Sequence, residues 1–373
     1  MNHRERMLAV LEGRSPDRIP WSPRLALWYN ARRLTSSLPP EYEGLSLRQV
    51  ERALGVACPA RDGNTMQSEC QGLALEIRRD GNREITEYVT PVGRLQRVIR
   101  YSDELERQGL PGRIVEYPLK DEDDYRIWEW VVEHTHWRPD YEAYERYDAE
   151  IGDDGLPMVS VGDVPFHNWL ENLAGYEHGF FHLADFPATV ERLLGLMAEV
   201  ERERLWPVIA KSPARFLLHG AHLSSQFTPP RYFGRYILPY YREFMPLMHA
   251  SDKFVAMHAD YDTSAILELI LEAGWDLLEC FVTAPMVPLT LERARAVLGN
   301  RVVIWGGLPS ALLAPYVTEE TFQETVKYIL RTVAPGDAFC LGVSDNVMPD
   351  SVIGRIAWVT EYLAENGAYP LEG

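Results

Sequence analysis

The amino-acid sequence predicts an α/β fold in which strands and helices alternate, and two observations lead to this prediction. Hydrophobic residues form 46% and charged residues 25% of the 373 residues, which is ordinary for a globular chain with a large core. From about residue 155 onward, short apolar runs alternate six times with helix-length amphipathic segments. Strands that alternate with helices in this way form a parallel sheet covered by helices.

Each element is placed by the position of its apolar run. We expect six strands, at residues 158–161, 216–219, 254–258, 277–280, 302–305 and 338–341. We expect the helices that follow them at residues 188–209, 231–249, 264–272, 291–297, 319–333 and 352–365. Six such units form either an open doubly wound sheet or most of a closed barrel. A barrel needs two more strands, which the first half of the chain offers at residues 18–22 and within residues 58–77.

The remaining part of the first half predicts an elaboration of this fold. Residues 83–101 form two β-rich runs joined at a Pro-Val-Gly turn, which is typical of a hairpin. Residues 120–147 are charged, aromatic and helix-like, and would cover either the outer wall of a barrel or its mouth. The sequence contains no internal repeat or low-complexity linker. We therefore expect one domain over residues 1–373, with an insertion at about residues 80–150.

Composition and charge narrow the classes of function. The formal net charge of −18 argues against nucleic acid or an anionic membrane as a partner, because both attract basic surfaces. No apolar stretch is long enough for a membrane span, and the first residues do not resemble an export signal. The four cysteines form no CxxC pair, so neither a disulfide framework nor a zinc knuckle is predicted. These features favour a cytoplasmic protein that acts on small molecules.

The first candidate site follows the strand expected at residues 254–258. In a barrel, functional residues lie at the carboxyl ends of the strands, where this strand ends in His258. Asp260 lies two residues later, and residues two apart in an extended chain face the same side. Both side chains are therefore candidate catalytic groups. The alternative is that His258 satisfies a hydrogen bond in the core and that Asp260 or Asp262 caps the next helix.

The second candidate site is the end of the next strand, where Glu279 and Cys280 interrupt an apolar run. A buried carboxylate is costly unless it is paired, protonated or bound to a cation. Because adjacent residues in a strand face opposite sides, we expect only one of the two to face the barrel lumen. His258 with either residue would supply two of the three protein ligands of a catalytic zinc, and we favour Glu279. The alternative for Cys280 is an inert buried thiol.

The third candidate site follows the last strand, where Gly342 allows close approach of a ligand and Asp345 precedes the final helix. Asp345 is a candidate to orient a histidine or to bind metal, or it is a solvated turn residue. Further candidates for contacts with a substrate, each with packing or capping as its alternative, are Arg24, Trp28, Asp163, His167, His219 and His222. No Gly-rich phosphate loop, GxSxG elbow or HExxH helix is present.

Several segments together resemble the uroporphyrinogen decarboxylase superfamily, which includes corrinoid-linked methyltransferases. The opening NHRERMLAVLEGRSPDRIPW resembles the helix, Pro-Asp-Arg turn and first strand of that superfamily. The later segments MHAD, GWDLLECFVTAP, VVIWGGLP and FCLGVSDNV stand where the superfamily has its strand ends. The resemblance covers nearly the whole chain and implies a TIM-type (β/α)8 barrel with N-terminal helical and hairpin elaborations. It also implies a homodimer, which is common among the relatives.

The sequence departs from the superfamily at two places that limit the function. The true decarboxylases carry Arg-Gln-Ala-Gly-Arg after the first strand to hold substrate carboxylates, whereas this chain reads SPRLALWYN. They also carry Gly-His after the last strand, and the zinc methyltransferases carry Gly-Cys there and His-x-Cys earlier. Here these positions are Gly342-Val343 and His258-Ala259-Asp260. The resemblance therefore implies a divergent branch rather than a true uroporphyrinogen decarboxylase.

The resemblance leads to three hypotheses for the function. The first is a zinc-dependent methyltransferase that moves a methyl group from a small donor, such as a methyl ether, to a corrinoid carried by a partner protein. In it, His258 and Glu279 hold the metal, with Asp260 or Cys280 as a further ligand. The second is a cofactor-free decarboxylase or lyase in which His258, Asp260 and neighbouring arginines act on a small carboxylic acid. The third is a binding module that has lost its catalytic residues.

Overall fold

The protein is described by a computed structural model of residues 1–372, which divides into two compact units. The first, called here the barrel unit, comprises Met1–Asn64, Glu142–Gly162 and Pro213–Gly373. The second, called here the insertion unit, comprises Thr65–Tyr141 and Asp163–Ser212. The expectation of one domain over the whole chain stays a prediction.

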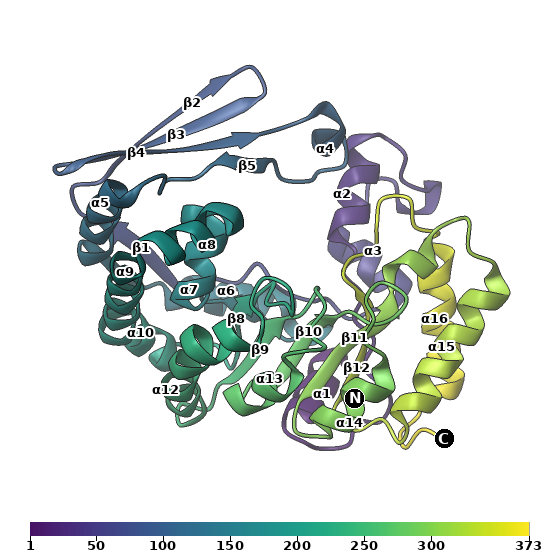
Figure 1. The fold of residues 1–373 in the computed structure, drawn as a ribbon. Helices are drawn as coiled ribbons and strands as arrows, with labels where there is room; N and C mark the ends of the chain where they lie inside the picture. The colour runs from purple at the N-terminus through teal and green to yellow at the C-terminus, as the bar shows by residue number, and fades with distance from the viewer. Residues whose placement is uncertain (373) are drawn as a thin grey trace. The chain divides into compact units, whose positions relative to one another are not determined.

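The barrel unit contains a parallel sheet of six strands that neighbour one another in chain order (Figure 1). The strands are β7 (Met158–Ser160), β8 (Phe216–Ala221), β9 (Phe254–His258), β10 (Leu277–Phe281), β11 (Val303–Pro309) and β12 (Phe339–Ser344). Each one overlaps a strand expected from the sequence, and β8, β10, β11 and β12 run further toward the carboxyl end. The prediction of alternating strands and helices with a parallel sheet is confirmed.

The first of the two additional strands lies beside β12. Trp21 forms a parallel bridge with Leu341. The amide of Ser22 donates to the carbonyl of Leu341 over 3.0 Å, and the amide of Leu341 donates to the carbonyl of Pro20 over 2.9 Å. The expected strand at residues 18–22 is therefore present as a short bridged segment rather than a full strand.

The second additional strand is shorter than expected and links this segment to β7. The amide of Ala57 donates to the carbonyl of Trp21 over 2.9 Å, and the amide of Met158 donates to the carbonyl of Ala60 over 2.9 Å. Only the first residues of the expected 58–77 stretch are used, because β1 (Met66–Cys70) pairs with another strand of the insertion unit. The ring of eight β-segments thus closes through residues 20–22 and 57–60.

Helices follow the strands of the barrel unit and lie beside them (Figure 1). After the strands come α11 (Pro230–Tyr232), α12 (Leu238–His249), α13 (Leu267–Ala273), α14 (Leu291–Leu298), α15 (Glu319–Val333) and α16 (Gly354–Asn366). The earlier part contributes α1 (His3–Leu11), α2 (Ala26–Leu34), α3 (Leu47–Leu54) and most of α6 (Tyr141–Ile151). The boundaries have local causes: the Thr318 hydroxyl caps the start of α15, and Gly274 in the left-handed region ends α13.

The core of the barrel is filled by apolar side chains from the first half of each strand. Met158, Phe216, Leu277 and Val303 belong to one buried cluster. The α1 residues Met7, Val10 and Leu11 belong to the same cluster, so helix α1 covers the amino-terminal end of the strands. The opposite end, where the strands finish, is the end that carries polar side chains.

The insertion unit contains two antiparallel sheets and a set of helices. The hairpin expected at residues 83–101 is present as β3 (Arg83–Thr90) and β4 (Gly93–Arg100), flanked by β2 (Ala74–Asp80) and β5 (Arg113–Glu116). The helix-like segment at residues 120–147 proves to be α5 (Glu122–Glu133), β6 (Thr135–Pro139) and the start of α6. The other helices are α4 (Asp103–Arg107), α7 (Pro165–Asn168), α8 (Tyr176–Asp185), α9 (Pro187–Val200) and α10 (Trp206–Lys211). Between residues 1 and 372, no helix is long and apolar enough to cross a membrane.

Candidate active site

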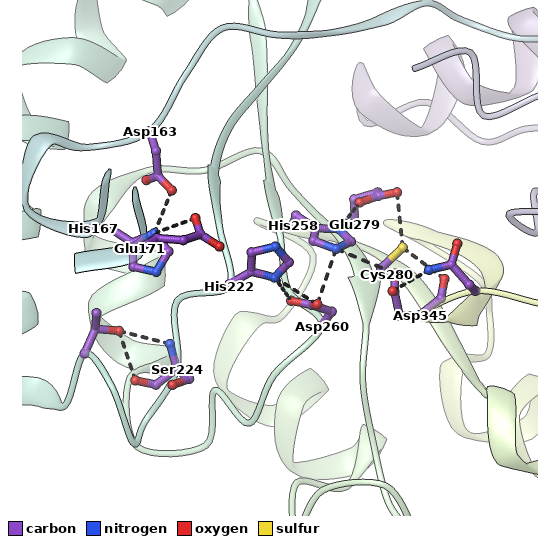
Figure 2. A network of polar contacts seen from close by, with 12 residues as sticks. Asp163, His167, Glu171, His222, Ser224, His258, Asp260, Glu279, Cys280 and Asp345 are labelled. Atoms are coloured by element: carbon purple, nitrogen blue, oxygen red, sulfur yellow. Dashed lines mark hydrogen bonds and ion pairs between the residues drawn. The ribbon is translucent and has the colours of Figure 1, made fainter. Parts of the chain in front are cut away.

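Polar side chains from four neighbouring segments meet at the carboxyl end of the barrel strands (Figure 2). His258 ends β9, and Asp260 follows it by two residues. Glu279 and Cys280 lie in β10, and Asp345 directly follows β12. His222 directly follows β8. Each of these positions is a strand end, where a TIM-type barrel places its functional residues.

Glu279 and Cys280 both face this cluster, so the expectation that only one of them would do so is wrong. The register of β10 against β11 shifts between Glu279 and Phe281, which is a β-bulge. Cys280 is the bulged residue and has a φ of 56°, outside the extended region. The regular alternation of strand side chains is lost at this point, and two consecutive side chains reach the same site.

Glu279 is the buried anion of the cluster, with none of its side chain exposed to solvent. Its carboxylate accepts a hydrogen bond from Nδ1 of His258 and another, over 3.0 Å, from Nη1 of Arg61. The Nε atom of Arg24 lies 3.9 Å from the same carboxylate. A buried carboxylate is stable only with such partners, because they replace the water it has lost.

The two ring nitrogens of His258 face different groups of the cluster. Nδ1 donates to Glu279, so the other nitrogen, Nε2, faces Asp260 and Asp345 on the opposite side of the ring. Nε2 lies 3.5 Å from a carboxylate oxygen of Asp260 and 3.6 Å from one of Asp345. Asp260 in turn accepts from Nδ1 of His222 over 2.8 and 2.9 Å. Nε2 of His258 is therefore the nitrogen available to a ligand.

Arg24 holds Cys280 and Asp345 together. Its Nη1 atom donates to Oδ1 of Asp345 over 2.5 Å and to Sγ of Cys280 over 3.2 Å. The second oxygen of Asp345 accepts from the amide of the Asn346 side chain over 2.5 Å. The Cys280 thiol also lies 3.2 Å from Glu279.

The charges of the cluster shift the acidities of its members. Burial alone would lower the pKa of His258, but the Glu279 carboxylate outweighs it and raises that pKa well above the usual value. Burial would likewise raise the pKa of Glu279, and the charges of His258 and Arg61 hold it below the usual range instead. Burial raises the pKa of the Cys280 thiol to about 12, with a smaller effect from Glu279. Both shifts favour a cationic His258 beside an anionic Glu279.

Two sets of potential metal ligands share His258. In the first set, ligand atoms of His258, Cys280 and Asp345 all lie within 4.8 Å of one another. In the second set, the same holds for His222, His258 and Asp260. Glu279 is in neither set, because its carboxylate is turned to Nδ1 of His258 and to Arg61. Its carboxylate fixes the orientation of the His258 imidazole.

A cavity of about 550 Å³ lies next to the cluster, within the barrel unit. Arg24 and Arg61 line this cavity and also contact the cluster, so the two are adjacent. Arg48, Glu51 and Tyr147 are further polar residues of its wall. The volume is within the range of pockets that bind small molecules.

Comparison with known proteins supports the assignment of this fold. A family model described as uroporphyrinogen decarboxylase matches residues 119–365, well over half of the chain. The chain belongs to the uroporphyrinogen decarboxylase family. Among solved structures, a methyltransferase from Methanosarcina mazei is similar over 98% of this chain and 99% of that chain, with 14% sequence identity and a TM-score of 0.57. At this identity the similarity concerns the fold alone. No curated protein sequence matches the chain.

The cluster brings together most of the site residues predicted from the sequence of this uroporphyrinogen decarboxylase family member. These are Arg24, His222, His258, Asp260, Glu279, Cys280 and Asp345. Two others lie elsewhere in the barrel unit. Trp28 is buried against Tyr42, and His219 is buried with Nδ1 against the hydroxyl of Tyr241 in α12. Their contacts are those of packing residues.

Asp163 and His167 lie in the insertion unit, where they form a group of their own. Nδ1 of His167 lies 2.7 Å from a carboxylate oxygen of Asp163 and 4.0 Å from one of Glu171. Nε2 of His167 lies 2.9 Å from the hydroxyl of Tyr176. Asp163, His167 and Glu171 form a third set of potential metal ligands.

The sequence interpretation missed Arg61, the strongest cationic partner of Glu279 outside β9. Arg61 directly follows the segment 57–60 that closes the barrel ring. Had the second strand been placed at that segment, Arg61 would have stood at a strand end like the other site residues. Glu171 was missed because its link to His167 depends on a spacing of four residues within helical structure.

Proposed function

We propose that this protein is a zinc-dependent methyltransferase component that takes a methyl group from a small-molecule donor and passes it to a corrinoid bound by a partner protein. The observation that carries the proposal is the first ligand set, in which an imidazole, a thiol and a carboxylate converge at the strand ends. The fold shared with a methyltransferase from Methanosarcina mazei is consistent with it.

The chemistry of the three donors fits zinc. Catalytic zinc takes three protein ligands from imidazole nitrogen, thiolate sulfur and carboxylate oxygen, and leaves a further position open. His258 would provide Nε2, Cys280 its sulfur and Asp345 an oxygen. This assignment differs from the sequence-based preference for Glu279, which we now place behind His258 as its orienting group. Asp260, expected as a catalytic group or further ligand, would complete the alternative set with His222.

The residues around these ligands would prepare the reaction in distinct ways. Bound zinc would supply Lewis-acid polarisation of the substrate heteroatom, which makes that atom a better leaving group. Glu279 fixes the ring of His258 through Nδ1, and Arg61 keeps Glu279 ionised. Arg24 positions Cys280 and Asp345 relative to each other. The adjacent cavity would hold the rest of the donor.

The deciding experiment is metal analysis of protein purified without chelator. We expect near-stoichiometric zinc in the wild type and its loss in His258→Ala, Cys280→Ala and Asp345→Ala. Cys340→Ala is the matched control, because Cys340 is also a buried strand cysteine but belongs to the apolar core. His167→Ala reports separately on the third ligand set in the insertion unit. A wild type that stays metal-free after reconstitution with zinc would disprove the proposal.

The acceptor requires its own test, because its support is the family resemblance alone. Zinc-loaded protein would be mixed with reduced free cobalamin and a panel of methyl ethers and other methyl donors. Formation of methylcobalamin, followed by its absorption spectrum, is the expected result for the correct donor. The same protein without zinc should show no formation above the rate of the Cys280→Ala variant.

A second candidate, a cofactor-free decarboxylase or lyase, is favoured by one further observation. Three arginines, Arg24, Arg48 and Arg61, line the cavity next to His258. Guanidinium groups hold carboxylates well, and His258 with Asp260 would then serve as acid and base. Release of CO₂ from a small carboxylic acid in the presence of a chelator would support this candidate and exclude the zinc mechanism.

A further inference from the structure

An imidazole and two carboxylates come together within the insertion unit. Nδ1 of His167 lies 2.7 Å from a carboxylate oxygen of Asp163 and 4.0 Å from one of Glu171. Potential ligand atoms of the three residues all lie within 4.8 Å of one another. We propose that this third ligand set binds an exchangeable divalent metal ion that prefers oxygen and nitrogen donors, such as Mn²⁺. The proposal does not depend on the proposed function.

His167 is held in the orientation that a metal site needs. Its side chain is fully buried, and Nε2 lies 2.9 Å from the hydroxyl of Tyr176. A histidine that binds metal through one nitrogen usually has its other nitrogen fixed by such a hydrogen bond. With Nε2 engaged by Tyr176, Nδ1 is the nitrogen that faces both carboxylates (Figure 2). Nδ1 is therefore the ligand atom, and it must be without a proton when the ion is bound.

The local backbone brings the three ligands to one side. His167 lies in α7, and Glu171 lies four residues later in the π-helical segment Trp169–Ala174 that continues it. Residues at this spacing share one face of a helix, and π-helical turns are rare and frequent at functional sites. Asp163 precedes α7, and its Oδ1 accepts from the amide of Val164 over 2.7 Å. This bond fixes the carboxylate so that Oδ2 is turned to His167.

The types of donor select the class of ion. Carboxylate oxygens suit Mg²⁺, Ca²⁺ and Mn²⁺, and an imidazole adds affinity for transition metals, so Mn²⁺ fits two carboxylates with one imidazole. The Glu171 side chain is 34% exposed, which leaves its carboxylate room to move the short distance to an ion near Nδ1. A set without thiolate that closes by such a movement should exchange its ion readily. It differs in this respect from the zinc ligands proposed above.

Titration with Mn²⁺ alone tests the site, because the electron paramagnetic resonance signal of the free ion falls as the ion binds. We expect one Mn²⁺ per chain in the wild type. His258→Ala should bind Mn²⁺ equally well, because His258 belongs to both of the other ligand sets and to neither residue of the third. This variant therefore separates the third set from the cluster at the strand ends.

Glu171→Gln is the decisive variant, because the side chain is partly exposed and keeps its size. It should weaken Mn²⁺ binding about tenfold or more, since loss of a direct ligand costs at least as much as loss of an outer hydrogen-bond partner. Glu177→Gln is the matched control, because Glu177 is an exposed glutamate of α8 in the same unit. His167→Ala should abolish binding, whereas His182→Ala removes a buried histidine that contacts Tyr125 and should leave binding unchanged.

Either of two results would overturn the proposal. One is a wild-type protein that binds no Mn²⁺ at millimolar concentrations of the ion. The other is equal Mn²⁺ affinity in Glu171→Gln and Glu177→Gln, and loss of binding in His258→Ala would then place the ion at the strand ends. Zinc content is measured separately, so failure of this proposal and failure of the proposed function are distinguishable.

Discussion

Glu279 shows how a single buried charge can serve an active site. Its carboxylate has no exposed surface, so its solvation comes from His258 and Arg61. A buried charged group contributes little net stability, because the loss of water offsets the attraction to its partners. Its effect is on geometry, since the carboxylate fixes which nitrogen of His258 faces Asp260 and Asp345.

The proposed orienting role of Glu279 predicts a graded effect on metal binding. Glu279→Gln keeps the size of the side chain but weakens its hold on His258, so zinc affinity should fall by about 10-fold to 100-fold. His258→Ala should abolish binding, because it removes a ligand. Competition with a chelating dye measures both. Equal losses in the two variants would instead make Glu279 a direct ligand.

Glu51 is a second buried carboxyl group, in the wall of the cavity, with only 3% of its surface exposed. Burial raises its pKa from 4.5 to about 7. The Cys58 hydrogen bond and Arg48 oppose this shift, while Asp154 and Asp62 add to it. Near neutral pH, a large share of Glu51 is therefore an uncharged acid.

The raised pKa of Glu51 predicts a pH dependence of stability with a definite sign. Below pH 4.5 the group is protonated in both states, and between pH 4.5 and about 7 only the unfolded chain ionises. Stability from this group therefore falls as pH rises, by about 3 kcal/mol at most. Urea unfolding of the wild type and Glu51→Gln at pH 5 and pH 8 measures it. Relative to the wild type, the free energy of unfolding of Glu51→Gln should be higher at pH 8 than at pH 5. The same difference between the two proteins at both pH values would contradict the prediction.

At the scale of elements, the bulge in β10 determines the composition of the site. It places Cys280 beside Glu279, and a glycine in the next strand makes room for it. Gly306 in β11 has a φ of 153°, and a Cβ atom there would lie 2.6 Å from the backbone nitrogen and oxygen of Phe281. The bulge in β10 therefore requires a residue without a side chain at position 306 of β11.

Gly306→Ala should therefore damage the site without changing any site residue. The clash with Phe281 should displace the bulge, lower the free energy of unfolding by about 3 kcal/mol and reduce zinc content. Gly354→Ala is the control, because a Cβ atom at the start of α16 meets nothing within 4 Å. Normal zinc content in Gly306→Ala would show that the bulge can relax without loss of the site.

The elements also show which features a sequence pattern can predict. Long apolar runs placed all six strands of the parallel sheet, because burial of a strand requires such runs whatever its neighbours are. The bulge at Cys280 escaped prediction, since it depends on Gly306 of another strand. The role of Glu279 escaped for the same reason, because its partner Arg61 is far away in sequence.

At the scale of the whole molecule, the barrel ring closes through two segments that are only three and four residues long. A segment as short as residues 57–60 gives no clear strand pattern in the sequence. Its position was therefore not predicted, and neither was the role of Arg61, which follows it. The family, by contrast, was predictable, because it rests on the order of many segments rather than on one pairing.

The proposed zinc site predicts that added zinc stabilises the whole barrel unit. A ligand that binds only the folded state adds about 2.7 kcal/mol at a free concentration 100 times its dissociation constant. Addition of zinc to chelator-treated wild type should thus raise the thermal midpoint, and Cys280→Ala should show no rise. Without zinc, Cys340→Ala should have a lower thermal midpoint than the wild type, because the substitution leaves a cavity in the core. Added zinc should raise its midpoint by as much as it raises that of the wild type. An equal rise in Cys280→Ala would place the bound metal elsewhere.

The bridge between Trp21 and Leu341 has a consequence for synthesis of the chain. The ribosome releases Leu341 320 residues after Trp21, so the ring cannot close while the chain between them is being made. Until then, the apolar residues of the first segments and of α1 lack their native partners. Contacts between such distant residues slow folding and prolong the exposure of apolar surface. Nascent chains of this protein should therefore depend on chaperones until the final strand emerges.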